Sequence, residues 1–359
     1  MLSLALLGLS EHFSSVPTRS PPAARVISIG DTRRQVSVCV PFFNEAQNLP
    51  ALIEALDGYV RLAAGRWPVR LDVIFVDDGS SDGGAEVLAA LAERRSLAFD
   101  LRLLRLSRNF GKEVALTAAL EAAQGDAVVL MDADLQHPVD LLDQFFAGWL
   151  NEGFDVVYAY QAANRPLALW HKTGRRLFYG LINASSDVPI PHDAGDFRLL
   201  SRRAYEALRT LGERQRLMKG LYSWIGFKQK GVAFTPPARR AGSSNYSAMK
   251  LSLLAIEGVT SFSLAPLRMA VWVGILLAVL SGGYGVWTIF EKLYLGIHVP
   301  GYPTLIVLIA LIGAFQLIFL GIIGEYLGKV LMEVKGRPLF VLESDERHPG
   351  AGLPAAEEG

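Results

Sequence analysis

The sequence predicts an α/β protein in which a Rossmann-like domain with a mostly parallel sheet precedes two transmembrane helices. Three observations lead to this prediction. Short apolar runs alternate with helical stretches across residues 35–235, as in βαβ units whose sheet is covered on both faces. Polar clusters follow these runs directly. Two apolar stretches of about twenty residues stand near the C-terminus, and each is long enough to cross a bilayer.

Five short apolar runs are predicted to form the strands of the sheet. They are Val36–Val40, Leu71–Val76, Leu101–Leu106, Val128–Met131 and Phe154–Tyr160. Helical stretches separate the first four runs, at about 48–64, 82–95 and 112–123. Right-handed crossovers between parallel strands place the carboxyl ends of the strands along one rim of the sheet. This rim is where a ligand is expected to bind.

Four polar clusters fall on this rim, each directly after a predicted strand. They are Asn44/Glu45, Asp77/Asp78, Arg108/Lys112 and Asp132/Asp134. One such cluster could be turn chemistry, but four on one rim indicate a binding site. No Gly-x-Gly-x-x-Gly motif follows the first strand and no Gly-Lys-Ser/Thr sequence closes a phosphate loop. These absences argue against dinucleotide redox chemistry and P-loop hydrolysis.

Asp132 and Asp134 predict a metal site. In an extended chain residues two apart point the same way, so the two carboxylates would converge and repel each other unless a cation lies between them. Mg²⁺ or Mn²⁺ suits such ligands, with the amide oxygen of Gln136 nearby and phosphate oxygens completing the shell. The alternative is a solvated acidic turn before a helix that begins at Pro138.

Composition sets limits on the partners and the compartment. Thirty-five basic residues balance 35 acidic ones, so no electrostatic argument favours nucleic acid. The single cysteine, Cys39, lies in an apolar run and suits a core position, as expected for a protein that faces the cytosol. Residues 1–34 lack a basic segment before their short apolar stretch and are expected to form a disordered tail rather than a signal peptide.

The C-terminal third predicts membrane attachment. The expected spans are about 269–290 and 304–323 within a segment 267–327, and apolar residues at helical spacing predict interfacial amphipathic helices within 236–266. Basic residues collect outside the short loop between the spans. The positive-inside rule therefore places the large domain and the tail, 328–359, in the cytosol. The tail beyond Leu342 is expected to be disordered. Gly324 and Gly328 could mark close helix packing, and with it a homo-oligomer.

The rim motifs resemble those of a known enzyme family. They are Val-Pro-Phe-Phe-Asn-Glu (40–45), Val-Asp-Asp-Gly-Ser-Ser-Asp (76–82), Ser-Arg-Asn-Phe-Gly-Lys-Glu (107–113) and Met-Asp-Ala-Asp-Leu-Gln-His-Pro (131–138). They are similar to family 2 glycosyltransferases of the GT-A fold, more narrowly to the polyprenyl-phosphate glycosyltransferases, which are bacterial relatives of dolichyl-phosphate mannose synthase. The resemblance continues through Asp-Ala-Gly-Asp-Phe-Arg (193–198), Ser-Phe-Ser-Leu-Ala-Pro-Leu-Arg (261–268) and Ile-Gly-Glu-Tyr-Leu-Gly-Lys (323–329), and covers about residues 35–340.

The resemblance implies a division of labour among these residues. The residues implied to bind the nucleotide-sugar donor are Pro41, Phe43, Glu45, Asp78, Lys112, Asp132, Ala133, Asp134 and Gln136. Among them Asp132, Asp134 and Gln136 would hold the metal. Asp196 would lie near the acceptor and act with Asp134 as a catalytic residue, although it could instead cap a helix or pair with Arg198.

Basic residues supply candidates for the acceptor phosphate. They are Arg175, Arg198, Arg239 and Arg240. The sequence departs from many relatives at Gln161 and Asn245, where the family often carries basic residues, so phosphate contacts could be redistributed. Candidates to compensate are Arg165, Lys172, Arg175 and Arg176, unless they form a solvated helix face.

The resemblance implies transfer of a sugar from a nucleotide donor, such as UDP-glucose, to polyprenyl (undecaprenyl) phosphate with inversion. The product would be a lipid-linked monosaccharide for glycans of the cell envelope, made at the inner (cytoplasmic) membrane. One alternative is a processive polysaccharide synthase, although the Gln-x-x-Arg-Trp motif of that class is missing. Another is a non-catalytic partner of a lipid-sugar flippase. No residue in the sequence indicates which sugar is moved.

Overall fold

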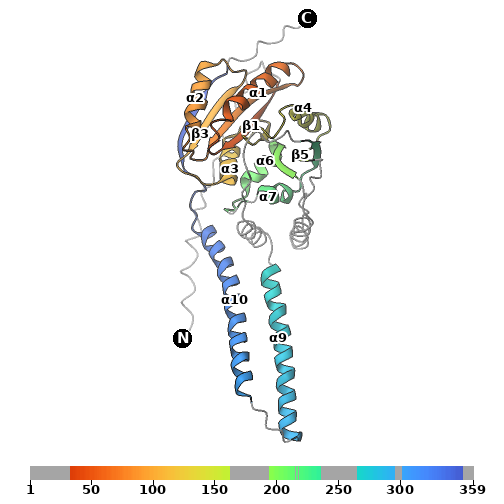
Figure 1. The fold of residues 1–359 in the computed structure, drawn as a ribbon. Helices are drawn as coiled ribbons and strands as arrows, with labels where there is room; N and C mark the ends of the chain where they lie inside the picture. The colour runs from red at the N-terminus through yellow and green to blue at the C-terminus, as the bar shows by residue number, and fades with distance from the viewer. Residues whose placement is uncertain are drawn as a thin grey trace, which may run out of the picture. The chain divides into compact units, whose positions relative to one another are not determined.

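A computed structural model of the protein describes residues 33–161, 194–214, 216, 218–235, 265–295 and 301–350. Eight strands form one sheet in the order β7-β5-β6-β4-β1-β2-β3-β8. Helices cover both faces of this sheet, and two long helices lie in the chain between β7 and β8 (Figure 1). The predicted α/β class with a mostly parallel sheet is confirmed, because β3, β2, β1 and β4 are all parallel.

The first part of the chain alternates strands and helices as predicted. Its elements are β1 (Arg34–Phe42), α1 (Leu49–Leu62), β2 (Val69–Asp77), α2 (Gly84–Arg94), β3 (Asp100–Leu106), α3 (Lys112–Ala122), β4 (Ala127–Leu130), α4 (Leu141–Phe146), the π-helical turn η1 (Ala147–Asn151) and β5 (Val156–Gln161). The remaining described elements are β6 (Ala194–Ser201), α6 (Arg202–Thr210), α7 (Met218–Trp224), β7 (Gln229–Phe234), α9 (Ala265–Phe290), the π-helical turn η2 (Glu291–Leu295), α10 (Tyr302–Val334) and β8 (Leu342–His348).

The strands are mostly apolar because both faces of the sheet are buried, although Ser37 of β1, Asp72 of β2 and Arg102 of β3 interrupt the apolar runs. Along β1, Val38 and Val40 face the layer formed by α1, α2 and α4, whereas Cys39 between them faces α3, α6 and α7. The thiol of Cys39 is fully buried, as the sequence predicts. The alanine-rich α3 presents Ala115 and Ala119 to the sheet, so this helix can pack closely beside the rim. The core therefore holds the strand ends in fixed positions.

Three strands depart from the predicted pattern. β6 lies between β4 and β5 and runs antiparallel to both, and β7 extends the sheet beyond β5. The third, β8, overturns the prediction that the tail beyond Leu342 is disordered. It pairs antiparallel with β3, and Asp345 accepts hydrogen bonds from Arg102 at 2.8 and 2.7 Å. The exposed edge of β3 and this ion pair order a strand that composition alone does not favour.

The two long helices are apolar and their side chains are largely exposed. Met269–Tyr294 and Val307–Val334 are both long and apolar enough to cross a bilayer. α10 continues to Val334, beyond the predicted span and the predicted start of the tail at 328. Near this end the Arg214 backbone N–H donates to Glu333 at 2.8 Å. Apart from the adjoining residues and backbone of α10, no described atom lies within 4 Å of a Cβ built at Gly324 or Gly328, so an oligomer through these glycines stays a prediction.

Candidate active site

The predicted rim encloses a pocket of about 330 Å³. β1 contributes Pro41 and Phe42, the loop after β2 contributes Asp78, and the chain after β4 contributes the aspartates. The lining residues are Pro41, Phe42, Phe43, Glu45, Asp78, Asn109, Gly111, Lys112, Ala115, Asp132, Ala133 and Asp134. Eight of the nine residues expected to bind the donor therefore lie together, and Gln136 is absent from the lining.

Asp78 builds one wall of this pocket. Its two carboxylate oxygens accept the backbone N–H groups of Phe110 and Gly111 at 2.7 and 2.9 Å, which fixes the loop between β3 and α3. Burial raises the pKa of Asp78, although these hydrogen bonds oppose the shift. Gly79 permits the close approach, because its φ is +71° and an added Cβ would lie 2.5 Å from the carbonyl carbon of Arg108.

The loop after β1 presents an aromatic ring to the pocket. Asn44 adopts a left-handed conformation, with φ at 55°, and its side-chain oxygen accepts the Ser81 N–H at 2.9 Å. The Ser80 hydroxyl in turn accepts the Asn44 N–H at 3.0 Å. These contacts tie the β1 loop to the β2 loop and leave Phe43 44% exposed at the pocket. An exposed ring in this position can stack on a flat ligand such as a nucleobase.

Asp132, Asp134 and His137 form a group that could hold a metal ion, because one ligand atom from each lies within 4.8 Å of the others. The convergence does not come from an extended strand as the sequence suggested. β4 ends at Leu130, and the chain then turns through Leu135, whose φ is 58°. The Gln136 N–H donates to Asp134 at 3.1 Å. A role for the Gln136 side chain as a ligand stays a prediction.

His137 is the candidate ligand that the sequence interpretation missed. Its ring stacks on Phe197 with 4.8 Å between centroids, and its buried Nδ1 has no hydrogen-bond partner among the described residues. Burial lowers the pKa of His137, although the nearby carboxylates oppose the shift, and this favours the neutral imidazole that binds metals. Two carboxylates and one imidazole fit Mn²⁺ well and can also bind Mg²⁺. An unpartnered nitrogen beside two carboxylates supports a ligand at this point.

Lys112 connects the metal candidates to Asp196. Its ammonium group lies 2.6 Å from Asp132 Oδ1 and 2.7 Å from Asp196 Oδ2. Burial would lower the pKa of Lys112, but the two carboxylates outweigh that effect and raise it. Conversely, burial alone would raise the pKa of Asp196, and Lys112 and Lys219 hold it below its usual value. Asp196 is therefore a charged group beside the metal candidates, paired with a lysine rather than with Arg198.

Arg198, a predicted ligand of the acceptor phosphate, is buried inside the domain. It is 2% exposed, its Nη2 donates to the Gly195 carbonyl at 2.6 Å, and its guanidinium carbon lies 3.6 Å from the centre of the Tyr222 ring. Strand alternation in β6 puts Arg198 on the same face as Leu200, beneath α7. The protein shields the guanidinium from solvent in this arrangement, and direct contact between Arg198 and the acceptor phosphate stays a prediction.

Comparison with known proteins identifies the family. The sequence matches the model described as glycosyl transferase family 2 over residues 37–209 and the GtrB C-terminal hairpin over residues 265–330. It is 38% identical over 310 residues to an uncharacterized glycosyltransferase of Synechocystis sp., covering 86% of this chain and 94% of the relative. The chain belongs to glycosyl transferase family 2. The predicted resemblance to polyprenyl-phosphate glycosyltransferases and the predicted GT-A fold class are confirmed.

Other relatives of this glycosyltransferase carry more specific names. This chain is 37% identical over 313 residues to a prophage-derived bactoprenol glucosyl transferase of Shigella flexneri. The match covers 87% of this chain and 99% of the relative. Among solved structures, glucosyl-3-phosphoglycerate synthase of Mycobacterium tuberculosis is 20% identical with a TM-score of 0.39. The match covers 63% of this chain and 78% of that one.

Several residues expected to meet the acceptor lie outside the described part of the glycosyltransferase. They are Arg165, Lys172, Arg175, Arg176, Arg239, Arg240 and Asn245. Of the predicted interfacial helices within 236–266, residues 236–264 lie outside it as well, and residues 265 and 266 belong to α9. Gln161, in place of a basic residue, is exposed at the end of β5. The acceptor path predicted from these residues therefore stays a prediction.

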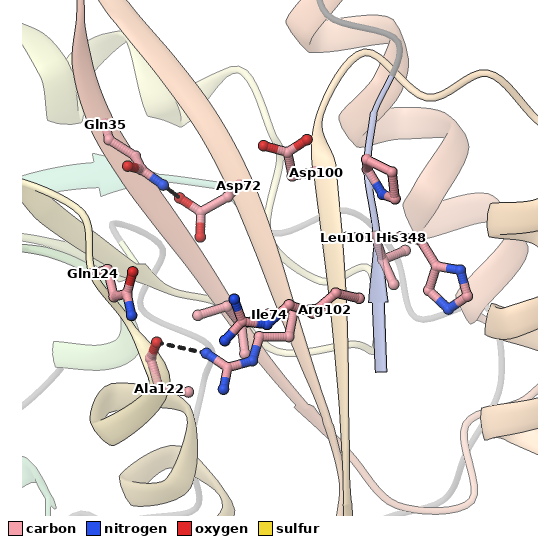
Figure 2. A pocket seen from close by; sticks show the side chains of 11 residues that line it. Gln35, Asp72, Ile74, Asp100, Leu101, Arg102, Ala122, Gln124 and His348 are labelled. Carbon is pink, nitrogen blue, oxygen red and sulfur yellow. Dashed lines mark hydrogen bonds between the residues drawn. The ribbon is translucent and has the colours of Figure 1, made fainter. Parts of the chain in front are cut away.

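A second cavity of about 300 Å³ lies at the other ends of the strands (Figure 2). Its charged side chains already take part in the fold. Arg102 donates to the Ala122 carbonyl at 3.0 Å and pairs with Asp345, while Asp72 accepts hydrogen bonds from Gln35 and Ser37. The cavity shares no lining residue with the rim pocket. The chemistry of the glycosyltransferase is therefore assigned to the rim.

Proposed function

We propose that this glycosyltransferase moves glucose from UDP-glucose to polyprenyl phosphate, with Mg²⁺ or Mn²⁺ bound at Asp132 and Asp134. The observation that carries the proposal is the rim pocket, in which carboxylates, an imidazole and a lysine meet beside an exposed aromatic ring. The name of the Shigella flexneri relative supports glucose and bactoprenol as the sugar and the lipid. The choice of uridine rests on the resemblance alone.

Each part of the pocket has a task in this proposal. Phe43 stacks on the base, and the wall held by Asp78 lines the nucleoside. Asp132, Asp134 and His137 supply metal ligands, with Gln136 as a further candidate. The chemistry that the metal supplies when bound is neutralisation of the charge that develops on the leaving diphosphate. Lys112 adds a positive charge at the same place.

The reaction is a single displacement at the anomeric carbon. An oxygen of the lipid phosphate forms a bond to this carbon while the bond from the carbon to the diphosphate oxygen breaks, and the nucleoside diphosphate leaves. Attack from the face opposite the leaving group inverts the configuration. A phosphate monoester has a second pKa near ~6 and is mostly dianionic at neutral pH, so no strong general base is needed. Asp196 acts here through Lys112, which it holds beside the reacting groups.

The membrane arrangement follows from the two long helices. They are proposed to cross the inner membrane as a hairpin, with the catalytic domain and the C-terminus in the cytosol. More basic residues lie outside the hairpin loop than within it, which supports this orientation. The domain would then meet nucleotide sugars on the cytosolic side and the lipid phosphate at the bilayer surface.

The two alternative functions have less support. A processive polysaccharide synthase would need further spans to form a channel, whereas the matched C-terminal segment is a hairpin. Two candidate spans occur in the part of the chain that the structure describes. A non-catalytic flippase partner would not need the carboxylates at the rim, which are intact. Transfer of a single sugar is therefore the function that the site favours.

The proposal is tested with the purified protein, undecaprenyl phosphate and radiolabelled UDP-glucose in the presence of Mn²⁺. We expect a lipid-linked monosaccharide, and less product with UDP-galactose or GDP-mannose. Asp134→Asn is expected to lower turnover at least ~100-fold, because charge stabilisation at a leaving group contributes about 3 kcal/mol or more. Asp140→Asn is the control, because this exposed aspartate of the same loop makes no side-chain cap hydrogen bond.

The outcomes separate the parts of the proposal. Turnover that persists in Asp134→Asn, or in excess EDTA, would refute the metal assignment. Product chains longer than one sugar would favour the polysaccharide synthase. No turnover with any nucleotide sugar, from protein with a normal melting transition, would favour the non-catalytic partner.

A further inference from the structure

We propose that Lys112 is the resident counter-cation of the metal-binding carboxylates, and that it moves to the donor's diphosphate when metal and nucleotide bind together. The inference rests on the proposed function and adds a role that residue types alone do not reveal. In this role Lys112 makes metal binding conditional on the nucleotide. Before the donor binds, Lys112 is a positioning residue that holds and neutralises the carboxylates of the metal site.

The first observation is the place that the ammonium group occupies. Lys112 Nζ lies 2.6 Å from Asp132 Oδ1 and 2.7 Å from Asp196 Oδ2, so it bridges two carboxylates from different strand ends. Within the described residues it is the one cationic group that forms an ion pair with Asp132, and Asp134 has none. The carboxylate that a metal would use is therefore already neutralised by the protein.

The second observation is that buried polar atoms near the Lys112 ion pairs have no hydrogen-bond partner among the described residues. The second oxygen of Asp196 and one oxygen of Glu113 are buried without a hydrogen-bond partner among the described residues. His137 Nδ1, in the group that includes Asp132, also has no partner among the described residues. Asp132, Asp134 and Asp196 together therefore bring more negative charge than one lysine neutralises, and the free oxygen of Asp196 is an acceptor that no described group satisfies. Such an arrangement is ready to take up a further cation.

A metal bound at Asp132 would lie close to the Lys112 ammonium, because both would contact the same carboxylate. The two cations repel each other at that distance, so Lys112 opposes metal that arrives alone. A diphosphate brings several negative oxygens into the pocket. Lys112 can then leave Asp132 and donate to a phosphate oxygen. The metal and the ammonium group are then both attracted to the negative diphosphate and no longer compete for Asp132. Metal and nucleotide should consequently favour each other's binding.

The local structure allows this movement. Lys112 is the first residue of α3, and its side chain is 44% exposed in the pocket. The preceding Gly111, with φ at +99°, has no atom within 4 Å of an added Cβ, so the space beside the start of the helix is open. A lysine side chain carries its charge on four methylene groups and can exchange partners without moving the helix. Asp196 contacts the same ammonium group and can retain it when Asp132 is released.

The test measures Mn²⁺ affinity and UDP affinity separately by isothermal titration calorimetry on the purified full chain. Lys112→Met keeps the length of the side chain and removes the charge. We expect it to bind Mn²⁺ alone at least ~10-fold more tightly than the wild type. In the presence of saturating Mn²⁺ we expect it to bind UDP at least ~10-fold more weakly. The opposite signs distinguish a counter-cation from a simple phosphate ligand.

Two further variants control the measurement. Lys112→Arg keeps the positive charge and is expected to bind Mn²⁺ alone as weakly as the wild type does. Lys219→Met removes an exposed cation that also lowers the pKa of Asp196 but forms no ion pair with Asp132. Its Mn²⁺ affinity is expected to stay within ~3-fold of the wild type. Equal gains in Lys112→Met and Lys219→Met would show a general effect of net charge and overturn the inference.

The remaining outcomes are also decisive. If Lys112→Met weakens UDP binding but leaves Mn²⁺ binding unchanged or weaker, Lys112 is a diphosphate ligand only and the inference is wrong. If the wild type binds Mn²⁺ neither alone nor with UDP, the metal assignment in the proposed function fails. If the wild type binds both but transfers no sugar to lipid phosphate, the proposed acceptor fails while the role of Lys112 stands.

Discussion

Replacing Asp78 with asparagine should loosen the nucleoside wall of the pocket. In the wild type both carboxylate oxygens accept a backbone N–H, from Phe110 at 2.7 Å and from Gly111 at 2.9 Å. Asparagine retains one acceptor and turns its NH₂ group toward the other N–H. One hydrogen bond to a charged acceptor is then lost, which costs about 1.5–3 kcal/mol in a buried site. Because the β3–α3 loop forms the pocket, we expect UDP to bind ~10- to 150-fold more weakly.

A matched variant separates this effect from general damage to a loop. Asp82 also accepts two backbone N–H groups, from Ala46 at 2.8 Å and from Gly84 at 3.1 Å, but it is exposed and does not line the pocket. Asp82→Asn is therefore expected to keep UDP affinity within ~3-fold of the wild type. Calorimetry with UDP and Mn²⁺ gives the affinities, and a melting curve reports stability. Wild-type affinity in Asp78→Asn would show that these hydrogen bonds do not shape the binding site.

Two further predictions concern pH and topology. Burial, reinforced by Asp196, raises the pKa of Glu113 from its ordinary value of 4.5 to about 7. The folded state therefore holds this proton more tightly than the unfolded state, and the stability that results is lost as the pH rises through 7. Denaturation of the purified protein between pH 5 and 8 should show this fall, with a smaller slope in Glu113→Gln; equal slopes would contradict the assignment. For topology, a cysteine replacing His298 should react with an impermeant thiol reagent in intact cells, whereas one replacing Gly350 should not. The native Cys39 is buried and should not react with the reagent. Reaction at position 350 alone would reverse the proposed orientation.

The parts of the fold that could be predicted are those that depend on local pattern. β1 to β4 are mostly apolar runs followed by polar residues, and parallel strands must bring their carboxyl ends to one rim. The pairing of β6 could not be predicted, because its insertion between β4 and β5 is decided by contacts far apart in the sequence. The burial of Arg198 could not be predicted for the same reason, since it follows from the face of β6 that α7 covers.

The candidate site likewise has parts that could be predicted from local pattern and parts that could not. Asp132 and Asp134 could be predicted as a pair from their spacing, but the turn that brings His137 to them depends on the positive φ of Leu135, which apolar side chains rarely adopt. The Lys112 bridge to Asp196 joins the start of α3 to β6 and has no signature in either segment alone. Spacing within a motif was therefore informative, whereas contacts between motifs required the folded chain.

The late position of β8 has a consequence for synthesis. Arg102 and Asp345, which pair across β3 and β8, are 243 residues apart. At ~5–20 residues per second, a ribosome needs roughly 12–50 s to make the chain between them. During that interval β3 presents an unpaired edge, and both membrane helices must be made before the strand that covers it exists. The catalytic sheet can therefore be completed only after α9 and α10 have been made, and a chain that ended before Leu342 would keep the edge of β3 unpaired.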